Sequence, residues 1–277
     1  MDFFNHTKKM TKEEILNRLW HDYITKNPHA GEIYRSFTDE GETVVNDHIA
    51  FRTFNIPAAG IDVLAKTFTR AGYVYRGDYH FEEKHLYAKH YEHEADKDAP
   101  RVFISELITD HFSPFLQETV RGISGKIPKG LPESGELVFA GNVWGRPSYE
   151  RYLRLREESE YAAWVYVHGF CANHFTVSVN HLKKYDSLQK VNAFLRERGF
   201  LLNDSAGEIK GSPQELLEQS STRAGLVEVD FSEGKHSIPA CYYEFARRYP
   251  DENGNIFSGF IARSADKIFE STDFYKK

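Results

Sequence analysis

A histidine and an arginine stand four residues apart in residues 45–54, a run of β-branched and aromatic residues that ends in an Asn-Ile-Pro turn. These residue types predict a β-strand. Side chains alternate between the faces of a strand, so His48 and Arg52 would share one face with Asn46 and Ala50. A neutral imidazole is a common metal ligand, and an arginine fork suits a carboxylate. Packed or solvated side chains would show the same spacing, so the pair alone does not establish a site.

A second histidine occurs in the same setting in residues 172–179, where His174, Thr176 and Ser178 would share a strand face. Each histidine strand is followed by a helical pattern that ends at a glycine, Gly72 or Gly199, at almost the same distance. A repeat of strand, helix and further strands indicates a duplicated module. Two such modules can build one site between them, each lending the equivalent position.

Glu244 is the third candidate, because a strand over residues 238–248 would place Tyr242, Glu244 and Ala246 on one face. A buried carboxylate is costly without a partner, which could be Arg247 or Arg248 in a salt bridge, or a metal ion. Two histidines and one carboxylate form the facial triad that leaves positions open on ferrous iron. The same ligand types also suit Mn, Co, Ni or Zn, so they do not select the metal.

Two other groups of reactive side chains are interpreted as structural. The histidines of residues 80–94 lack the HExxH spacing of a helical zinc site and predict a solvated hairpin: His80, His85, His90 and His93. Cys171 and Cys241 each precede a candidate ligand by three residues and are expected to be small core residues rather than nucleophiles.

The elements around these residues predict an α+β fold. A capping box from Thr11 to Glu14 opens a helix to residue 26, a second helix follows Pro28, and residues 61–71 form a third. A strand is expected at 101–107, a long Gly- and Pro-rich connection (a lid or crossing segment) at 111–145, and a helix at 147–164. One compact domain would then comprise a helical layer (1–44), a first module (45–110), an insertion (111–165) and a second module (166–277).

Composition describes an ordinary globular chain of 277 residues, with 40% hydrophobic and 27% charged residues. The net charge of -6 gives no reason to expect a nucleic-acid or membrane partner. No apolar run is long enough to span a bilayer, and the first residues lack the apolar core of a signal peptide. With only two cysteines, a reduced, cytoplasmic protein is expected.

Four motifs in order resemble the 2-oxoadipate dioxygenase/decarboxylase family, formerly a domain of unknown function. They are Asp-His-Ile-Ala-Phe-Arg-Thr-Phe at 47–54, Asn-His-Phe-Thr at 173–176, Gln-Ser-Ser-Thr at 219–222 and Tyr-Tyr-Glu-Phe-Ala-Arg-Arg at 242–248. The resemblance runs from about residue 45 to residue 260. That family belongs to the vicinal-oxygen-chelate superfamily and is similar to hydroxyphenylpyruvate dioxygenase in its iron site.

The resemblance implies two βαβββ modules whose curved sheet surrounds an Fe(II) site. By motif, the iron ligands would be His48, His174 and Glu244; Arg52 would be catalytic and would contact the substrate carboxylate. Near the pocket would lie Gln219, Ser220 and Ser221. The implied reaction converts 2-oxoadipate to 2-hydroxyglutarate with O2, in lysine breakdown and without an organic cofactor. The chain looks shorter than those enzymes, so its 2-oxo acid can differ from theirs.

Alternatives stay open on the same fold. Glu106 lies where isomerases of the superfamily can carry a fourth ligand, although a structural ion pair would also explain it. A metal-dependent hydrolase or isomerase would use Glu106 or Glu244 as a general base. A non-catalytic binding protein is the most distant alternative, because all three candidate ligands are present.

Overall fold

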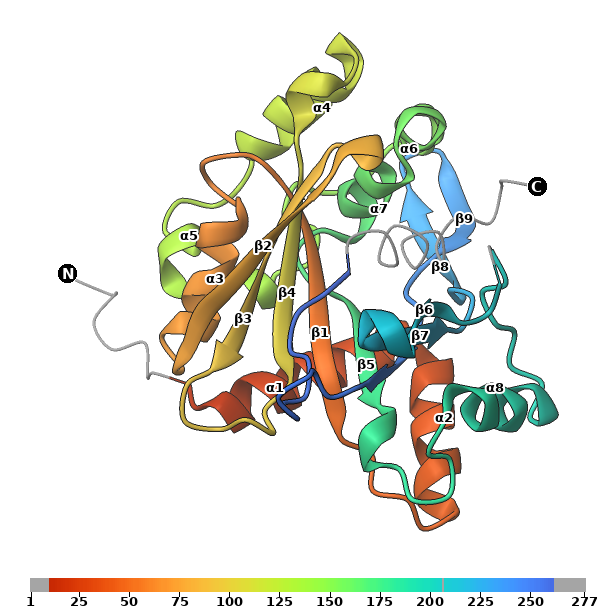
Figure 1. Ribbon diagram of the computed structural model, residues 1–277. Coiled ribbons are helices and arrows are strands. Elements are labelled where there is room, and N and C mark those ends of the chain that lie inside the picture. The colour runs from red at the N-terminus through yellow and green to blue at the C-terminus, as the bar shows by residue number, and fades with distance from the viewer. Residues whose placement is uncertain (1–9, 206, 262–277) are drawn as a thin grey trace.

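The computed structural model describes residues 10–205 and 207–261 and shows one curved, eight-stranded sheet (Figure 1). Its strands lie in the order β2-β3-β4-β1-β5-β10-β7-β6. Their bounds are β1 Asn46–Phe54, β2 Tyr73–Phe81, β3 Leu86–His93, β4 Arg101–Leu107, β5 Ala172–Ser178, β6 Lys210–Ser212, β7 Leu217–Ser221 and β10 Glu244–Arg248.

The sheet consists of two halves with the same connectivity, as the repeat predicts. The first is β1, helix α3 (Ile61–Thr69), β2, β3 and β4; the second is β5, helix α8 (Leu188–Glu197), β6, β7 and β10. In each half the first strand pairs parallel with the last one, and the others continue antiparallel. The halves join where β1 pairs antiparallel with β5. The α+β fold of two βαβββ modules is therefore confirmed.

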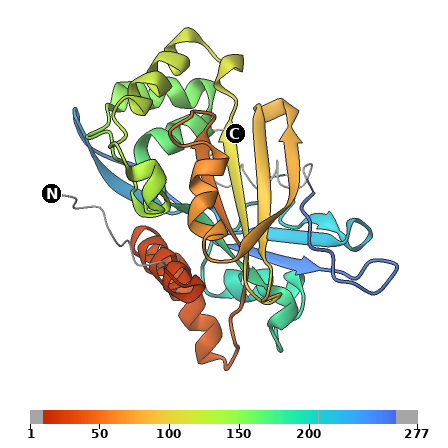
Figure 2. The same ribbon diagram turned by 90° about the vertical axis from the view of Figure 1, so that its left-hand side faces the viewer.

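Helices cover the sheet face opposite the two histidines. Helix α1 (Lys12–Lys26) begins at the predicted capping box and packs Trp20 against Phe175, with ring centroids 5.1 Å apart. Helix α2 (Pro28–Asp39) follows it, and Phe68 of α3 packs against Phe51 of β1 at 5.4 Å. Since Phe51 and Phe175 alternate with the histidines along their strands, the other face is left for the site. Figure 2 shows α1, α2 (red) and α3 (orange) together on one side of the strands.

The insertion between the halves is more helical than its sequence suggests. It contains α4 (Pro114–Ser124), α5 (Leu131–Ser134), α6 (Tyr149–Glu158) and α7 (Glu160–His168). The Gly- and Pro-rich connection expected at 111–145 thus includes α4, where Ser113 caps the helix and Leu116, Val120 and Ile123 are buried. The single helix expected at 147–164 is wrong: Ser159 has extended backbone, and its side chain caps α7.

The chain segment that connects β7 to β10 forms a hairpin of β8 (Leu226–Phe231) and β9 (Gly234–Pro239), which is a separate two-stranded sheet. The strand expected over residues 238–248 is therefore two strands, with residues 240–243 irregular between them. The hairpin packs on α6, where the Tyr149 ring stacks on His236 with centroids 3.5 Å apart.

Short 3-10 turns complete the chain: η1 Glu82–Lys84, η2 Thr109–His111, η3 Leu137–Phe139, η4 Val179–His181 and η5 Pro213–Glu215. None of the helices in residues 10–205 and 207–261 has the length and apolar character needed to cross a membrane.

Candidate metal centre

Three neighbouring strands bring His48, His174 and Glu244 together. His48 of β1 lies level with Thr176 of β5, and Thr176 lies level with Glu244 of β10. His174 is two residues before Thr176 and therefore on the same face. One ligand atom from each of the three residues lies within 4.8 Å of the others, and all three side chains are buried. His48 and His174 are therefore close in space, as the sequence prediction of a shared site required.

The residue before each histidine fixes its imidazole. Asp47 Oδ1 lies 2.7 Å from His48 Nδ1, and Asn173 Oδ1 lies 3.0 Å from His174 Nδ1. Because both oxygens accept hydrogen bonds, each Nδ1 carries the proton and each Nε2 keeps its lone pair. The two Nε2 atoms face Glu244, at 3.4 Å for His48 and 3.3 Å for His174. Partners of this kind orient the imidazole ligands of metal ions.

The Glu244 carboxylate is bound on one oxygen only. Gln219 Nε2 donates to Oε1 at 2.6 Å, whereas Oε2 has no hydrogen-bond partner among the described residues. Burial raises the pKa of Glu244 to about 8, although the bond from Gln219 opposes the shift. The salt bridge to Arg247 or Arg248 considered for this carboxylate is wrong, because Arg248 binds Asp47 instead. A cation at Oε2 would compensate the buried charge.

Both imidazoles are held in the form that binds metals. Burial lowers the pKa of His48, with Asp47 opposing the shift. Burial also lowers the pKa of His174 well below its usual value, and the charges of His48 and Arg52 act in the same direction. Neutral imidazoles and a carboxylate with a free oxygen are the donor set of a two-histidine, one-carboxylate metal site. The residues present thus fit a divalent cation of the first transition row.

Arg52 lies beyond His174 at the end of β1 near α7. Its guanidinium is 1% exposed, contacts Glu160 Oε1 at 3.3 Å and lies over the rings of Tyr161 and Trp164. The Tyr242 ring stacks on His174 with centroids 4.6 Å apart, and the charge of Arg52 acts on both residues. The structure therefore brings Arg52 close to the ligands, on the side where α7 closes the site.

The three polar residues of β7 do not face the same way. Ser221 lies level with Glu244 and Gln219 with Ala246, so both are on the ligand face. Ser220 lies level with Phe245 on the opposite face, where its hydroxyl donates to Asn192 of α8 at 2.8 Å. The structure thus places Gln219 and Ser221 beside the ligands and corrects the position expected for Ser220.

Glu106 is not part of the cluster. Its Oε2 accepts a hydrogen bond from the main chain of Ile61 at 2.9 Å, at the start of α3, where the preceding Gly60 has no side chain to cap the helix. Glu106 thus acts as a helix cap, and within the described ranges it forms neither the fourth ligand nor the ion pair considered for it. Burial raises its pKa, although the hydrogen bond from Ile61 and the charge of Lys89 oppose the shift.

The other reactive side chains are structural. The predicted hairpin of β2 and β3 is present, but His90 within it is buried rather than solvated and contacts the Tyr79 hydroxyl at 2.9 Å. Both cysteines are free and buried, and burial raises the pKa of each thiol, as expected for core residues.

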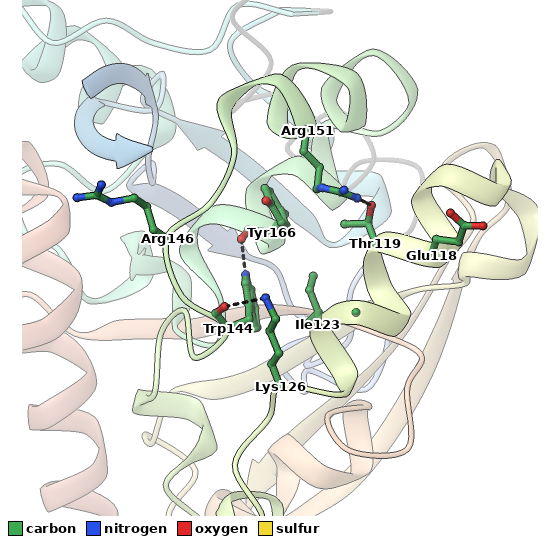
Figure 3. Close-up of a pocket in the computed structure, with 9 residues that line it drawn as sticks. Glu118, Thr119, Ile123, Lys126, Trp144, Arg146, Arg151 and Tyr166 are labelled. Atoms are coloured by element: carbon green, nitrogen blue, oxygen red, sulfur yellow. Dashed lines mark hydrogen bonds between the residues drawn. The ribbon is translucent and has the colours of Figure 1, made fainter. Parts of the chain in front are cut away.

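A pocket of about 250 Å³ lies away from the ligands, within the insertion (Figure 3). Helices α4, α6 and α7 and the loop at Trp144 line it, and Lys126 donates to the carbonyl oxygen of Trp144 at 3.4 Å. It contains no histidine or cysteine, so the metal-ligating chemistry lies between the two modules rather than here.

Sequence reasoning did not identify the residues that support the candidate ligands. These are Asp47 and Asn173, Arg248 on Asp47, Thr176, whose hydroxyl lies 3.1 Å from His48 Nε2, and Phe260, whose ring centroid lies 4.9 Å from that of His48. The doublets Asp-His at 47–48 and Asn-His at 173–174 were the available signal for the first two. Contacts that cross between the modules left no such signal.

The profile of the 2-oxoadipate dioxygenase/decarboxylase family matches residues 13–127 and 137–251. Relatives named 2-oxoadipate dioxygenase/decarboxylase, from Oryza sativa subsp. japonica and Arabidopsis thaliana, are each 36% identical over 93% of this chain, covering 78% and 76% of their own lengths.

Solved structures agree with these matches. The hydroxyglutarate synthase of Oryza sativa in complex with 2-oxoadipate has a TM-score of 0.87 and 35% identity, covering 94% of this chain and 91% of its own. A Shewanella frigidimarina NCIMB 400 protein described provisionally as a hydrolase has a TM-score of 0.86 and 46% identity over 93% and 99%. A protein of Ralstonia eutropha JMP134, assigned provisionally to the glyoxalase superfamily, shares the fold at 22% identity, with a TM-score of 0.72 over 91% and 87% of the two chains. The chain therefore belongs to the 2-oxoadipate dioxygenase/decarboxylase family, as its four motifs predict.

Proposed function

We propose that this protein is an Fe(II)-dependent dioxygenase that decarboxylates a dicarboxylic 2-oxo acid, with 2-oxoadipate as the first candidate. The observation that carries the proposal is the convergence of two neutral imidazoles with a buried carboxylate oxygen that accepts no hydrogen bond from the described residues. Family membership and the 2-oxoadipate complex of the rice structure support the choice of substrate. His48, His174 and Glu244 would hold the metal, which supplies Lewis acidity and redox chemistry with O2 when bound.

The protein's own residues would bind and orient the acid. Arg52 has the fixed fork that pairs with a carboxylate, and its 3.3 Å contact with Glu160 Oε1 supports a role in binding the carboxylate of the acid. Gln219 holds Glu244 in place, and burial of all three ligands excludes water. The reaction needs no separate reductant, since 2-oxoadipate and O2 together contain the atoms of 2-hydroxyglutarate and CO2.

A hydrolase is the second candidate, because the relative from Shewanella frigidimarina NCIMB 400 is provisionally described as one. Glu244 would then be the general base. Glu106 is a poor base for this purpose, since it caps α3.

Oxygen consumption separates the two functions. Protein purified anaerobically and supplied with Fe(II) would be mixed with dicarboxylic 2-oxo acids, and O2 uptake, CO2 release and product mass would be recorded. We expect equal amounts of O2 consumed and CO2 released, with a hydroxy acid one carbon shorter as product. Turnover without O2 uptake would support the hydrolase instead.

A cytoplasmic location is also proposed, on the evidence of two buried, unpaired cysteines. The plant relatives are named as plastid proteins. Fractionation of the source cells tests the proposal.

A further inference from the structure

Arg248 connects the second module to the ligand supplied by the first. It is the last residue of β10, is 3% exposed, and lies four residues after Glu244, at a position of the strand that points to the same face. Its Nε and Nη2 donate to the two oxygens of Asp47 at 2.7 and 2.9 Å. Asp47 in turn accepts from His48 Nδ1. A bidentate pair of this kind fixes direction as well as distance.

The remaining nitrogen of the same guanidinium binds the segment after β10. Nη1 donates to the carbonyl oxygens of Phe257 and Gly259 at 3.1 and 2.7 Å. This segment places the Phe260 ring against the His48 ring, with centroids 4.9 Å apart, and Phe260 N donates to the Tyr79 hydroxyl at 3.1 Å. The Arg248 side chain thus binds both Asp47, the hydrogen-bond partner of His48, and the segment that carries the Phe260 ring.

The main chain of Arg248 is also fixed. Asn180 donates from Nδ2 to its carbonyl oxygen and accepts from its amide, both at 2.8 Å. Arg101 is the other cation near Asp47, but its Nη1 is 3.6 Å from Oδ2, beyond hydrogen-bond distance. In this geometry the hydrogen bonds to Asp47 from a guanidinium therefore come from Arg248.

We propose that Arg248 is a positioning residue of the metal centre, which sets the tautomer and orientation of His48 through Asp47 and seats Phe260 over the same ligand. The inference rests on the proposed function only for the presence of a metal at the three ligands. Both Asp47 oxygens accept hydrogen bonds from the Arg248 fork, and Oδ1 also faces His48 Nδ1, so this geometry presents Asp47 to His48 as an acceptor. An acceptor at Nδ1 keeps the proton there and leaves Nε2 for the metal.

The second histidine is an internal control for this proposal. His174 Nδ1 donates its hydrogen bond to Oδ1 of the neutral Asn173, whose Nδ2 has no partner in the described parts of the chain. Loss of Arg248 should therefore change His48 and leave His174 as it is.

The test compares Arg248→Lys and Arg248→Met with a matched control, Arg247→Met. Arg247 precedes Arg248 on the strand and lies over the Tyr249 ring instead. In metal-free protein, imidazole nitrogen NMR reports the tautomer of each histidine, and Co(II) titration followed by visible absorption reports affinity. We expect both Arg248 variants to lose the single His48 tautomer and to bind Co(II) about 10- to 100-fold more weakly. His174 in these variants, and both readouts in Arg247→Met, should match the original protein.

Backbone hydrogen exchange tests the second half of the proposal. Amides of residues 257–260 should exchange faster in Arg248→Met than in the original protein. Unchanged exchange would remove the seating role, and unchanged His48 tautomer with unchanged Co(II) affinity would overturn the positioning role.

Failure of Arg248→Met to fold is handled by the double variant Asp47→Asn with Arg248→Met, which leaves no lone buried charge. That variant should fold and still bind Co(II) more weakly, whereas original affinity in it would also overturn the proposal. Since neither readout requires turnover, these results are independent of whether the protein oxidises a 2-oxo acid.

Discussion

The two modules have the same connectivity but contribute differently to the site. In the second, the residue on the last strand that lies level with Thr176, two after His174, is Glu244. In the first, the residue level with Ala50, two after His48, is Phe103, whose ring packs on Phe260 at 4.8 Å. The first module therefore supplies one candidate metal ligand and an apolar wall, whereas the second supplies two candidate ligands.

This difference explains how a duplicated fold can leave coordination positions open. Four equivalent ligands from two identical modules would fill more of the metal's positions, as a closed site does. With Phe103 in place of a carboxylate, three candidate ligands would remain, and Phe103 and Phe260 form an apolar wall beside His48. The modules also differ in charge near the site. Arg52 of β1 corresponds to the neutral Ser178 of β5, since each follows its histidine by four residues.

The largest effect is expected from removing one of the two candidate ligands that the second module supplies. His174→Ala should lose bound metal and turnover, because two side chains cannot hold the cation in place of three. Metal content by mass spectrometry of the purified protein checks this, with the exposed His80→Ala as control. Full metal content in His174→Ala would contradict the ligand assignment.

Making the modules alike should abolish turnover without loss of metal. Phe103→His adds a neutral ligand at the position equivalent to Glu244 and would occupy a place that the acid or O2 needs. We expect metal content to be retained and O2 uptake to fall at least about 100-fold, or about 2.7 kcal/mol. Phe103→Leu, which adds no ligand, is the control. Normal turnover in a metal-loaded Phe103→His would show that the register-based equivalence is wrong.

Removing the Arg52 guanidinium tests the difference in charge between the two modules. Arg52→Ala should spare metal content but lower kcat/KM for a 2-oxo acid about 100-fold, mainly through KM, because a charge-assisted pair is lost. Ser178→Ala removes the equivalent side chain of β5, which contacts His181, and should leave KM unchanged. Equal kinetics for Arg52→Ala and the original protein would remove Arg52 from substrate binding.

The smallest effect concerns the β8–β9 hairpin, which the first module lacks. Glu233 accepts hydrogen bonds from Ser148 and Tyr149 at the start of α6, and these lower its pKa to about 2. A lowered pKa in the folded state stabilises the protein above the ordinary value near 4.5, and this stabilisation is lost as pH falls towards 2. Glu233→Gln should therefore lower Tm slightly at pH 7, and the difference should shrink towards pH 3. A difference independent of pH would exclude this origin.

The sequence was sufficient wherever a local pattern determined the structure. The capping box at Thr11 set the start of α1, and alternation along residues 45–54 placed His48 and Arg52 towards one site. Alternation also ruled out a common direction for Gln219, Ser220 and Ser221, although the expectation placed all three at the pocket. That error came from treating a motif as a unit rather than from missing information.

Contacts between distant parts of the chain were not predictable in the same way. Nothing local shows that Arg248 pairs with Asp47 rather than with the nearer Glu244, since the choice depends on the register of three strands. The break between α6 and α7 depended on Ser159 acting as a cap, in a stretch whose helical periodicity continues across it. The role of Glu106 as the cap of α3 likewise required the tertiary structure.

The order of the three candidate ligands along the chain has a consequence for protein synthesis. The nascent chain contains His48 and then His174 before it contains Glu244, and β10, which carries Glu244, is the last of the eight strands in the sequence. Neither half contains the donor set, so a redox-active ion could be captured only after most of the chain had left the ribosome. Late capture would spare a partly folded chain from oxidation at its own metal site.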